Sequence, residues 1–216
     1  IYTSYNVGFL SYVCCSKNNV SLSANSNSLI REIKWLAARC LADTLFNKTT
    51  TDNRHTRIKL KNISNSTVQN NILFNNHNDQ IALVDSSNNR INGNNLKNQQ
   101  VGISVDPGSN ESKINDNTIT NSSTYAIYLY GGASKNNVSS NAISNSLISG
   151  IYVVGKGSLD NTFQNNKISD NKQTGIKLQN ITTTTVQNNI LFNNHTDQIV
   201  LADWWNNKLN GNAFEN

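Results

Sequence analysis

"VQNNILFNNH" occupies residues 68–77, and the same ten residues return at 186–195. The surrounding segments 58–96 and 176–214 match at 26 of 39 positions, at an offset of 118 residues. Within the stretch, an apolar residue is followed three residues later by Asn, and two residues after that by a second apolar residue. This pattern occurs seven times, so the two copies belong to one longer internal repeat.

The repeat has a period of 22–25 residues, and each unit also carries an Ile-x-Leu or Ile-x-Val pair, such as Ile127 and Leu129. Three short segments of alternating apolar residues in each unit predict three strands. A unit of this size cannot bury an apolar face alone, so the units are expected to stack into a parallel β-helix. The recurring Asn then aligns into a ladder of amide groups along the stack. The ladder residues are Asn71, Asn94, Asn117, Asn141, Asn166, Asn189 and Asn212.

Two lines of the repeat carry a resemblance to a known superfamily: "NNVSSNAISNSLISGIYV" at 136–153 and "NNKISDNKQTGIKL" at 165–178. They resemble the repeats of right-handed parallel β-helix proteins of the pectin-lyase-like superfamily, and the resemblance extends over 58–216. That superfamily contains polysaccharide lyases, polygalacturonases, mannuronan C-5 epimerases, phage tailspikes and surface proteins that are not enzymes. The resemblance therefore implies an all-β, single-stranded, right-handed solenoid, and leaves the activity open.

The N-terminal quarter, residues 1–57, is expected to be a degenerate version of the repeat, and residues 58–216 form seven regular coils. Apolar residues at helical spacing predict a capping helix over 28–47 that shields the end of the solenoid. The alternative interpretation assigns this segment to degenerate coils, with Ile33 and Trp35 on a strand. The three cysteines, Cys14, Cys15 and Cys40, all lie in this quarter and permit at most one disulfide within the chain.

The composition excludes several classes of protein. The chain has 42 Asn residues and only 36% hydrophobic residues, but the regular period and the single Pro indicate an ordered fold. A formal charge of +5 favours an anionic partner, whereas the absence of Lys and Arg runs argues against nucleic acid. No apolar stretch is long enough to span a membrane. We therefore expect a secreted or cell-surface protein with a polysaccharide partner.

The outward positions of the Ile-x-Leu strands form one long face, on which Tyr128, Tyr130 and Tyr152 are expected to cluster between Asp106 and Lys177. A Tyr side chain has a flat apolar ring and a polar tip, which suits carbohydrate binding. The alternative is that the rings pair across coils for stability alone.

Catalysis is the second interpretation of the same face. The sequence Asp106-Pro107-Gly108 resembles the Asp-Pro-His motif of mannuronan C-5 epimerases, and the resemblance implies catalytic roles for Asp106, Tyr128, Tyr130 and Lys177. Gly108 stands where that family has His, and Ile103 where it has Tyr, so we favour a simple turn. The carboxylate sets of polygalacturonases and the acidic calcium clusters of pectate lyases are absent, and no cofactor is expected.

Three further features of the sequence bear on binding and assembly. Trp204 and Trp205 adjoin the last Ile-x-Leu strand, where they could bind a ligand or cover the final coil. His77 with Asp79, and His195 with Asp197, recur at equivalent turns, but neither pair has a third ligand, so no metal site is expected. The final coil has no apparent cap, which leaves open end-to-end association or membership of a longer chain. We favour a carbohydrate-binding structural or adhesive module over a polyuronate-acting epimerase or lyase.

Overall fold

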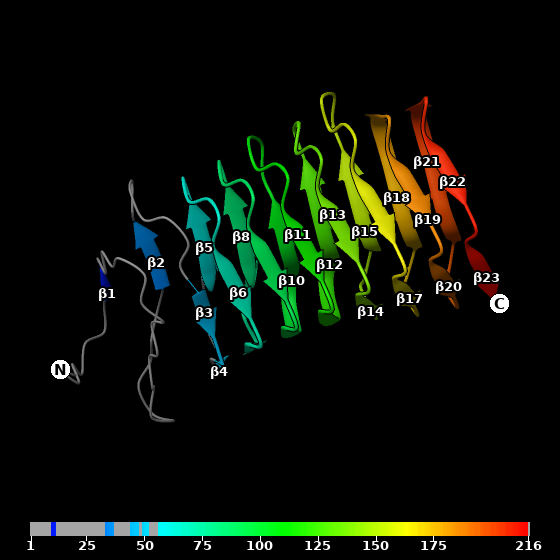
Figure 1. Cartoon of the computed structure of the whole chain (residues 1–216). Helices are drawn as coiled ribbons and strands as arrows, with labels where there is room; N and C mark the ends of the chain where they lie inside the picture. Colours follow the sequence, from blue (N-terminus) through cyan, green and yellow to red (C-terminus); the bar gives the residue numbers. More distant parts are fainter. Residues whose placement is uncertain (1–9, 12–32, 37–43, 48, 52–55, 216) are drawn as a thin grey trace.

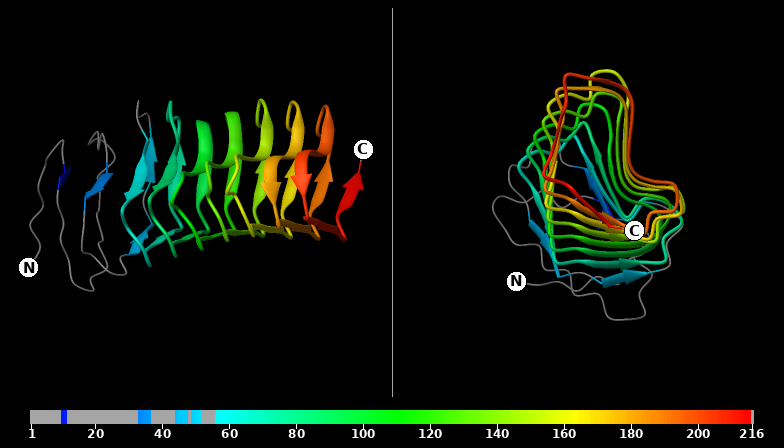
Figure 2. Two further views of the ribbon diagram at one scale, coloured as in Figure 1. Left: turned by 90° about the horizontal axis from the view of Figure 1, so that it is seen from above. Right: turned by 90° about the vertical axis from the view of Figure 1, so that its right-hand side faces the viewer.

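The computed structural model describes residues 10–11, 33–36, 44–47, 49–51 and 56–215, and these residues form strands and turns without a helix. Successive coils stack along one axis from the N-terminal to the C-terminal side (Figure 1), and they superimpose when seen along that axis (Figure 2). Neighbouring coils pair in parallel, for example β12 with β15 and β16 with β19. The predicted parallel β-solenoid is confirmed.

Each complete coil has three sides. The first side carries the Ile-x-Leu strands: β5 (Ile58–Lys61), β8 (Ile81–Val84), β10 (Asn95–Val105), β12 (Thr118–Tyr130), β15 (Ser149–Val154), β18 (Thr174–Thr182) and β21 (Asp197–Trp205). The second side is an eight-stranded sheet: β3 (Thr44–Phe46), β6 (Thr67–Gln69), β9 (Arg90–Asn92), β11 (Lys113–Asn115), β13 (Asn137–Ser139), β16 (Thr162–Gln164), β19 (Thr185–Gln187) and β22 (Lys208–Asn210).

The third side joins the first in one fifteen-stranded sheet, because β10 and β12 each run through both sides. Its separate strands are β4 (Thr49–Thr51), β7 (Ile72–Phe74), β14 (Ala142–Ser144), β17 (Lys167–Ser169), β20 (Ile190–Phe192) and β23 (Ala213–Glu215). In the coils of β10 and β12, the strand therefore continues through the turn between the third side and the first side.

The predicted Asn ladder is present at the turn between the second and third sides. The Nδ2 atom of Asn94 donates a hydrogen bond to Oδ1 of Asn117 at 2.9 Å, and Nδ2 of Asn117 donates to Oδ1 of Asn141 at 3.0 Å. Both Asn117 and Asn141 are 1% exposed. The ladder satisfies amide groups that would otherwise be buried without partners.

The ladder alone does not account for the high Asn content. A second buried column follows the turn between the first and second sides, where the backbone N–H of Asn136 donates to Oδ1 of Asn161 at 2.9 Å. Other Asn residues occupy left-handed backbone positions, such as Asn98 (φ 55°) and Asn145 (φ 59°). Asn tolerates this conformation better than most residues with a Cβ atom, so the many tight turns explain its abundance.

The predicted helix over 28–47 is wrong wherever the structure describes that segment. Residues Ile33–Leu36 form β2, and Thr44–Phe46 form β3. Strand β2 pairs with β5 and also with β1 (Leu10–Ser11), while β3 pairs with β6. Pairing with the next coil overrides the local helical pattern, as the alternative interpretation expected for Ile33 and Trp35. Residues 28–32 and 37–43 lie outside the described residues, as do all three cysteines.

Candidate functional site

The outward face of the first side has the register that the repeat predicts. Ser104 lies opposite Tyr128, Tyr128 opposite Tyr152, and Tyr152 opposite Lys177, in four successive coils. Because neighbouring coils are about 4.8 Å apart, these side chains form one continuous column. The structure thus brings Tyr128 and Tyr152 together and places Lys177 at the C-terminal side of the pair.

Four tyrosines form a single cluster, called the Tyr cluster below: Tyr125, Tyr128, Tyr130 and Tyr152. The ring of Tyr128 stacks on Tyr130 with centroids 4.9 Å apart and planes at 15°, and on Tyr152 with centroids 5.5 Å apart and planes at 18°. Tyr125 lies 5.1 Å from Tyr128 and 4.9 Å from Tyr152 in tilted arrangements. All four side chains are half-buried.

This geometry determines what the Tyr cluster can offer to a ligand. Where two rings of the cluster stack, the faces in contact cover each other and cannot contact a ligand. Each such ring pair contributes about 0.5–1.5 kcal/mol beyond its buried area. Among the described rings, Tyr130 contacts only Tyr128, so the cluster covers only one of its faces. The ligand-facing surface therefore consists of phenol hydroxyls, ring edges and the outer face of Tyr130.

Tyr125 was missed from the sequence, because strict alternation around Ile127 assigns it to the interior. The alternation breaks at a corner, where Ala126 and Ile127 are both buried. The equivalent corner residue Gly102 shows why a small residue is needed, since a Cβ there would lie 2.5 Å from the carbonyl oxygen of Ala126. Because of this corner, the side chain of Tyr125 lies on the outer face of the solenoid instead of in the interior. A small residue before the Ile in four of the coils was the available signal: Gly102, Ala126, Gly150 and Gly175.

The C-terminal edge of the Tyr cluster carries a positive charge. The Nζ atom of Lys177 lies 5.3 Å from the ring centroid of Tyr152, within the range of a cation–π contact. The hydroxyl of Tyr152 donates a hydrogen bond to Oε1 of Gln179 at 2.9 Å. Lys177 therefore lies beside a phenol whose orientation is fixed, where it can meet a carboxylate.

The N-terminal edge of the Tyr cluster carries two carboxyl groups. Ser104 donates a hydrogen bond from Oγ to Oδ2 of Asp79 at 2.7 Å, and its hydroxyl also lies within hydrogen-bonding reach of Asp106. The hydroxyl of Tyr130 donates to Asp106. A serine hydroxyl has only one proton to donate. Asp79, Ser104, Asp106 and Tyr130 are thus one hydrogen-bonded group, and sequence reasoning had assigned only Asp106 and Tyr130 to the site.

Burial raises the pKa of Asp79 above its usual range, and the charge of Asp106 adds to this rise, whereas the Ser104 hydroxyl and the Lys59 ammonium lower it. Burial also raises the pKa of Asp106, against the hydrogen bond from Tyr130 and the charge of Lys59. Burial is thus the main cause of the raised pKa of both carboxyl groups. They hold protons at a higher pH than exposed carboxyl groups do.

The tyrosines respond to the same surroundings. Burial raises the pKa of Tyr130 to about 12, with contributions from the charge of Asp106 and the hydrogen bond to it. Burial is also the main cause of the raised pKa values of Tyr125, Tyr128 and Tyr152. A general base works best with a pKa near the operating pH. The four phenols are therefore hydrogen-bond donors at neutral pH and poor bases.

The structure supports the turn interpretation of Asp106-Pro107-Gly108. The backbone N–H of Ser109 donates to the carbonyl oxygen of Asp106 at 3.1 Å, and Gly108 has a φ of 79°. Pro followed by a residue with positive φ is typical of a type II turn. A residue with a Cβ would be strained at the positive φ of Gly108, and its Cβ would lie 2.7 Å from Oδ1 of Asp85, so this turn disfavours the His of the epimerase motif.

Replacing Asp79 with Asn is expected to raise the melting temperature at pH 7 by a few degrees and to change it little at pH 3. A carboxyl group with a raised folded pKa binds more protons in the folded chain, so its contribution to stability falls as the pH rises through that pKa. Asn retains an acceptor for Ser104 and carries no charge. Thermal unfolding at the two pH values measures the effect, and Asp197→Asn is the control, because this duplicated counterpart is exposed. A lower melting temperature for Asp79→Asn at pH 7 would contradict the assignment.

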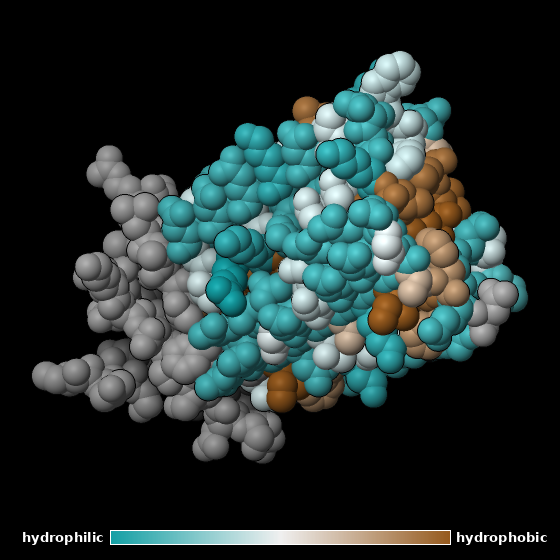
Figure 3. All heavy atoms as spheres, turned by 45° about the vertical axis from the view of Figure 1, so that its right-hand side comes forward, coloured by the Kyte–Doolittle hydropathy of each residue, from teal (hydrophilic) through white to brown (hydrophobic). Residues whose placement is uncertain are grey.

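Trp204 and Trp205 lie on β21, two coils beyond Tyr152, so the structure does not join them to the Tyr cluster. Trp205 is 75% exposed, whereas Trp204 packs against the core. Apolar side chains gather at this end of the molecule (Figure 3), where Leu209 and Phe214 are 44% and 53% exposed. Trp204 covers the core of the last coils, and Trp205 is available to a ligand.

Neither a metal centre nor a membrane span emerges from the residues that the structure describes. In that part of the chain, no three His, Cys, Asp or Glu side chains are grouped to hold a metal ion. The same residues include no apolar helix of membrane-spanning length. His77 and Asp79 lie five coils from their duplicated counterparts His195 and Asp197, roughly 24 Å along the stack.

Comparison with solved structures identifies relatives in fold. The periplasmic alginate epimerase AlgG superposes with a TM-score of 0.68 at 15% identity, over 80% of this chain and 50% of that chain. The A-module of the Azotobacter vinelandii mannuronan C-5 epimerase AlgE4 gives 0.58 at 14% identity, over 80% and 56%. The Dettilon tailspike protein gp208 gives 0.56 at 10% identity, over 81% and 55%. The chain thus spans about half the length of each, and at such identities the likeness shows the fold alone.

Comparison with family models is more decisive. No curated protein sequence matches the chain. The model described as the right handed beta helix region matches residues 6–143 and 130–214, which together extend over nearly the whole chain. The stacked parallel coils and the buried Asn ladder agree with this match. The chain therefore belongs to the right-handed β-helix family.

Proposed function

We propose that the chain is a secreted or cell-surface β-solenoid that binds an anionic polysaccharide across the Tyr cluster, in a structural or adhesive role without catalysis. The observation that carries the proposal is the half-buried cluster of four phenols on one continuous face, with Lys177 at its edge. Phenols combine apolar contact area with hydrogen-bond donors, as a sugar surface requires. The named activities of two fold neighbours, an alginate epimerase and a mannuronan C-5 epimerase, agree with a polysaccharide partner.

The length of the face suits a polymer better than a small ligand. The column from Ser104 to Lys177 extends over four coils, and three intervals of about 4.8 Å give roughly 14 Å. A chain molecule lying along the stack contacts equivalent positions of successive coils. The ammonium group of Lys59 interacts electrostatically with the carboxyl groups of Asp79 and Asp106. Lys177 is therefore the cation on this face that is best placed to bind a uronate carboxylate.

A polyuronate-acting epimerase or lyase is the second candidate, and the group formed by Asp79, Ser104, Asp106 and Tyr130 is the observation that favours it. Carboxyl groups with raised pKa values can act as acids or bases near neutral pH. Two features favour binding instead. The phenol of Tyr130, with a pKa of about 12, is a poor base, and Lys177 lies three coils away from Ser104 and Asp106, so it cannot neutralise a carboxylate held there.

Replacing Lys177 with Gln is expected to lower the affinity for oligouronates from alginate or pectate about three- to tenfold, and to weaken the dependence of that affinity on salt concentration. An ammonium group at the rim of a binding surface acts mainly through screened electrostatic attraction. Isothermal titration at two salt concentrations measures both effects. Lys208→Gln, an exposed change on the second side of the solenoid, is the control and should leave the affinity unchanged. An unchanged affinity in Lys177→Gln would contradict the anionic specificity.

The same mixtures separate binding from catalysis. A lyase produces an unsaturated uronate that absorbs in the ultraviolet, and an epimerase exchanges the C5 proton with solvent. Binding without either signal agrees with the proposed non-catalytic role. Turnover that is lost in Asp106→Asn would overturn that role and establish the second candidate.

A further inference from the structure

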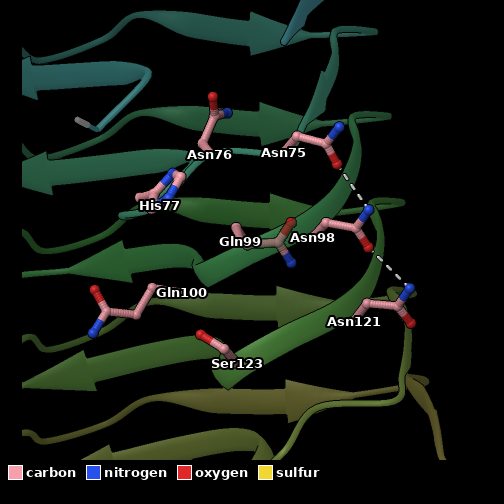
Figure 4. Close-up of a pocket in the computed structure, with 8 residues that line it drawn as sticks. All are labelled: Asn75, Asn76, His77, Asn98, Gln99, Gln100, Asn121 and Ser123. Atoms are coloured by element: carbon pink, nitrogen blue, oxygen red, sulfur yellow. Dashed lines mark hydrogen bonds between the residues drawn. The ribbon is translucent and has the colours of Figure 1, made fainter. Parts of the chain in front are cut away.

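A hollow of about 450 Å³ lies on the turns that join the third side of the solenoid to the first, in three successive coils (Figure 4). One wall is a ladder of exposed amides. The Nδ2 atom of Asn98 donates to Oδ1 of Asn75 at 2.8 Å, and Nδ2 of Asn121 donates to Oδ1 of Asn98 at 3.0 Å. A carboxamide has two N–H donors and two acceptor sites. The ladder therefore leaves a second N–H on Asn98 and on Asn121, and further acceptor sites on all three amides.

The opposite wall consists of His77, Gln100 and Ser123, which lie in a second column across the hollow in Figure 4. All three are exposed. The backbone does not require polar residues here, because the left-handed turn positions are those of Asn75, Asn98 and Asn121, with φ of 55–57°. In the next coil the residue equivalent to Ser123 is Leu147, which is 54% exposed. Leu147 therefore ends the polar wall on the C-terminal side of the hollow.

The floor of the hollow is fixed by hydrogen bonds. Gln99 donates from Nε2 to Oγ of Ser122 at 2.7 Å and to the carbonyl oxygen of Thr120 at 3.2 Å. Asn76 donates from Nδ2 to Oε1 of Gln80. Both Gln99 and Asn76 are buried. A floor held in this way limits the ordering that binding requires, so the hollow is organised before a ligand arrives.

The lining selects one class of ligand. Among the residues that the structure describes, the lining contains no Lys, Arg, Asp or Glu, so these residues offer no charge partner for an anion and no carboxylate oxygens for a hard cation. The same described residues include no Phe, Tyr, Trp or aliphatic side chain that would anchor a peptide or an apolar molecule. Amides, imidazole and hydroxyl all donate and accept hydrogen bonds, as sugar hydroxyls do. We infer that the hollow is a subsite for uncharged saccharide residues.

This subsite is separate from the Tyr cluster and shares no residue with it, so the inference does not rest on the proposed function. Equivalent donors and acceptors repeat every 4.8 Å or so along the axis, which allows one oligosaccharide to contact more than one coil. A site built to hydrogen-bond hydroxyl groups discriminates against ligands that lack them. The hollow and the Tyr cluster therefore differ in the charge of the sugar that each prefers.

The test uses uncharged hexasaccharides of glucose, mannose and xylose, titrated into the whole chain by calorimetry. At least one is expected to bind with a Kd below about 1 mM. Gln100→Ala is expected to weaken that binding about tenfold or more, and Gln100→Glu, which keeps the shape but removes both N–H donors, is expected to weaken it similarly. Gln100 is exposed, so neither change should alter the melting temperature.

The duplicated sequence supplies a matched control. His195 lies in the same local sequence as His77 but outside the hollow, so His77→Ala should weaken binding whereas His195→Ala should not. Tyr128→Ala should leave the binding of uncharged sugars intact. The inference is overturned if no uncharged hexasaccharide binds, if both Gln100 variants bind as the natural chain does, or if Tyr128→Ala abolishes the binding. The last result would place uncharged sugars on the Tyr cluster.

Discussion

Asn117→Ala is expected to lower the free energy of unfolding by about 3 kcal/mol or more, since each buried group left without a partner costs about 1–3 kcal/mol. Oδ1 of Asn117 accepts from both the backbone N–H and the Nδ2 atom of Asn94, at 3.0 and 2.9 Å. Nδ2 of Asn117 donates to the carbonyl oxygen of Ile91 at 2.9 Å. Alanine removes these partners from groups that remain buried. Chemical denaturation of the two proteins measures the difference.

The matched control is Asn115→Ala, two residues earlier on β11, because Asn115 is half-exposed and its side chain bonds only to Asp116 among the described residues. It should change the stability by less than about 0.5 kcal/mol, as surface substitutions usually do. Asn117→Asp adds a second test, because a buried carboxylate cannot donate to Ile91. The stability that this variant loses relative to the natural chain should be larger at pH 7 than at pH 3. Equal stabilities of Asn117→Ala and the natural chain would contradict the structural role of the ladder.

Tyr128→Ala is expected to lower the affinity for oligouronates about thirtyfold, the effect of losing a central contact residue worth about 2 kcal/mol. Tyr128 is the ring that contacts all three other members of the Tyr cluster. Its removal opens the centre of the binding surface and allows the neighbouring rings to move. Calorimetric titration with oligouronates of six residues measures the change.

Two further variants separate the causes of that effect. Tyr128→Phe retains the ring contacts and removes one hydroxyl, so it should lose affinity less than tenfold. Trp205→Ala removes an exposed aromatic side chain two coils from Tyr152 and should leave the affinity unchanged. An affinity that survives Tyr128→Ala, in a variant with an unaltered fold, would show that the cluster serves stability alone.

The fold was predictable because its determinants are periodic. Residues equivalent to Asn117 and Ile119 recur at a fixed spacing in the seven regular units. When the units stack, the apolar residues form a buried column and the Asn residues form an amide ladder. The register of Tyr128 with Tyr152 also followed from the period. The segment 28–47 was predicted wrongly in its described part, because an amphipathic pattern also fits a degenerate coil once β5 supplies a pairing partner. The local sequence pattern of 28–47 carries no information about pairing with β5.

The site was only partly predictable, because its missing members depend on turns. Tyr125 reaches the face through the corner at Ala126, and Asp79 reaches Ser104 from the turn of a neighbouring coil. His77 and Gln100 line the same hollow only because the turns of three coils stack on one another. A two-residue period describes strands and cannot place residues that follow a bend. Ala126, a small residue before Ile127, was the signal for Tyr125, whereas Gln80 stands at the equivalent corner beside Asp79 and gives no such signal.

The most direct test of the carbohydrate-binding face is a titration of the chain, labelled with ¹³C in its tyrosine rings, with a hexameric oligouronate. Resonances are assigned by Tyr→Phe variants at the four cluster positions. Binding across the Tyr cluster predicts saturable shifts for the rings of Tyr128, Tyr130 and Tyr152, with the largest change at Tyr130, whose outer face is not covered by another described ring. Saturable binding of the oligouronate with no shift in any of these rings would contradict the proposed function.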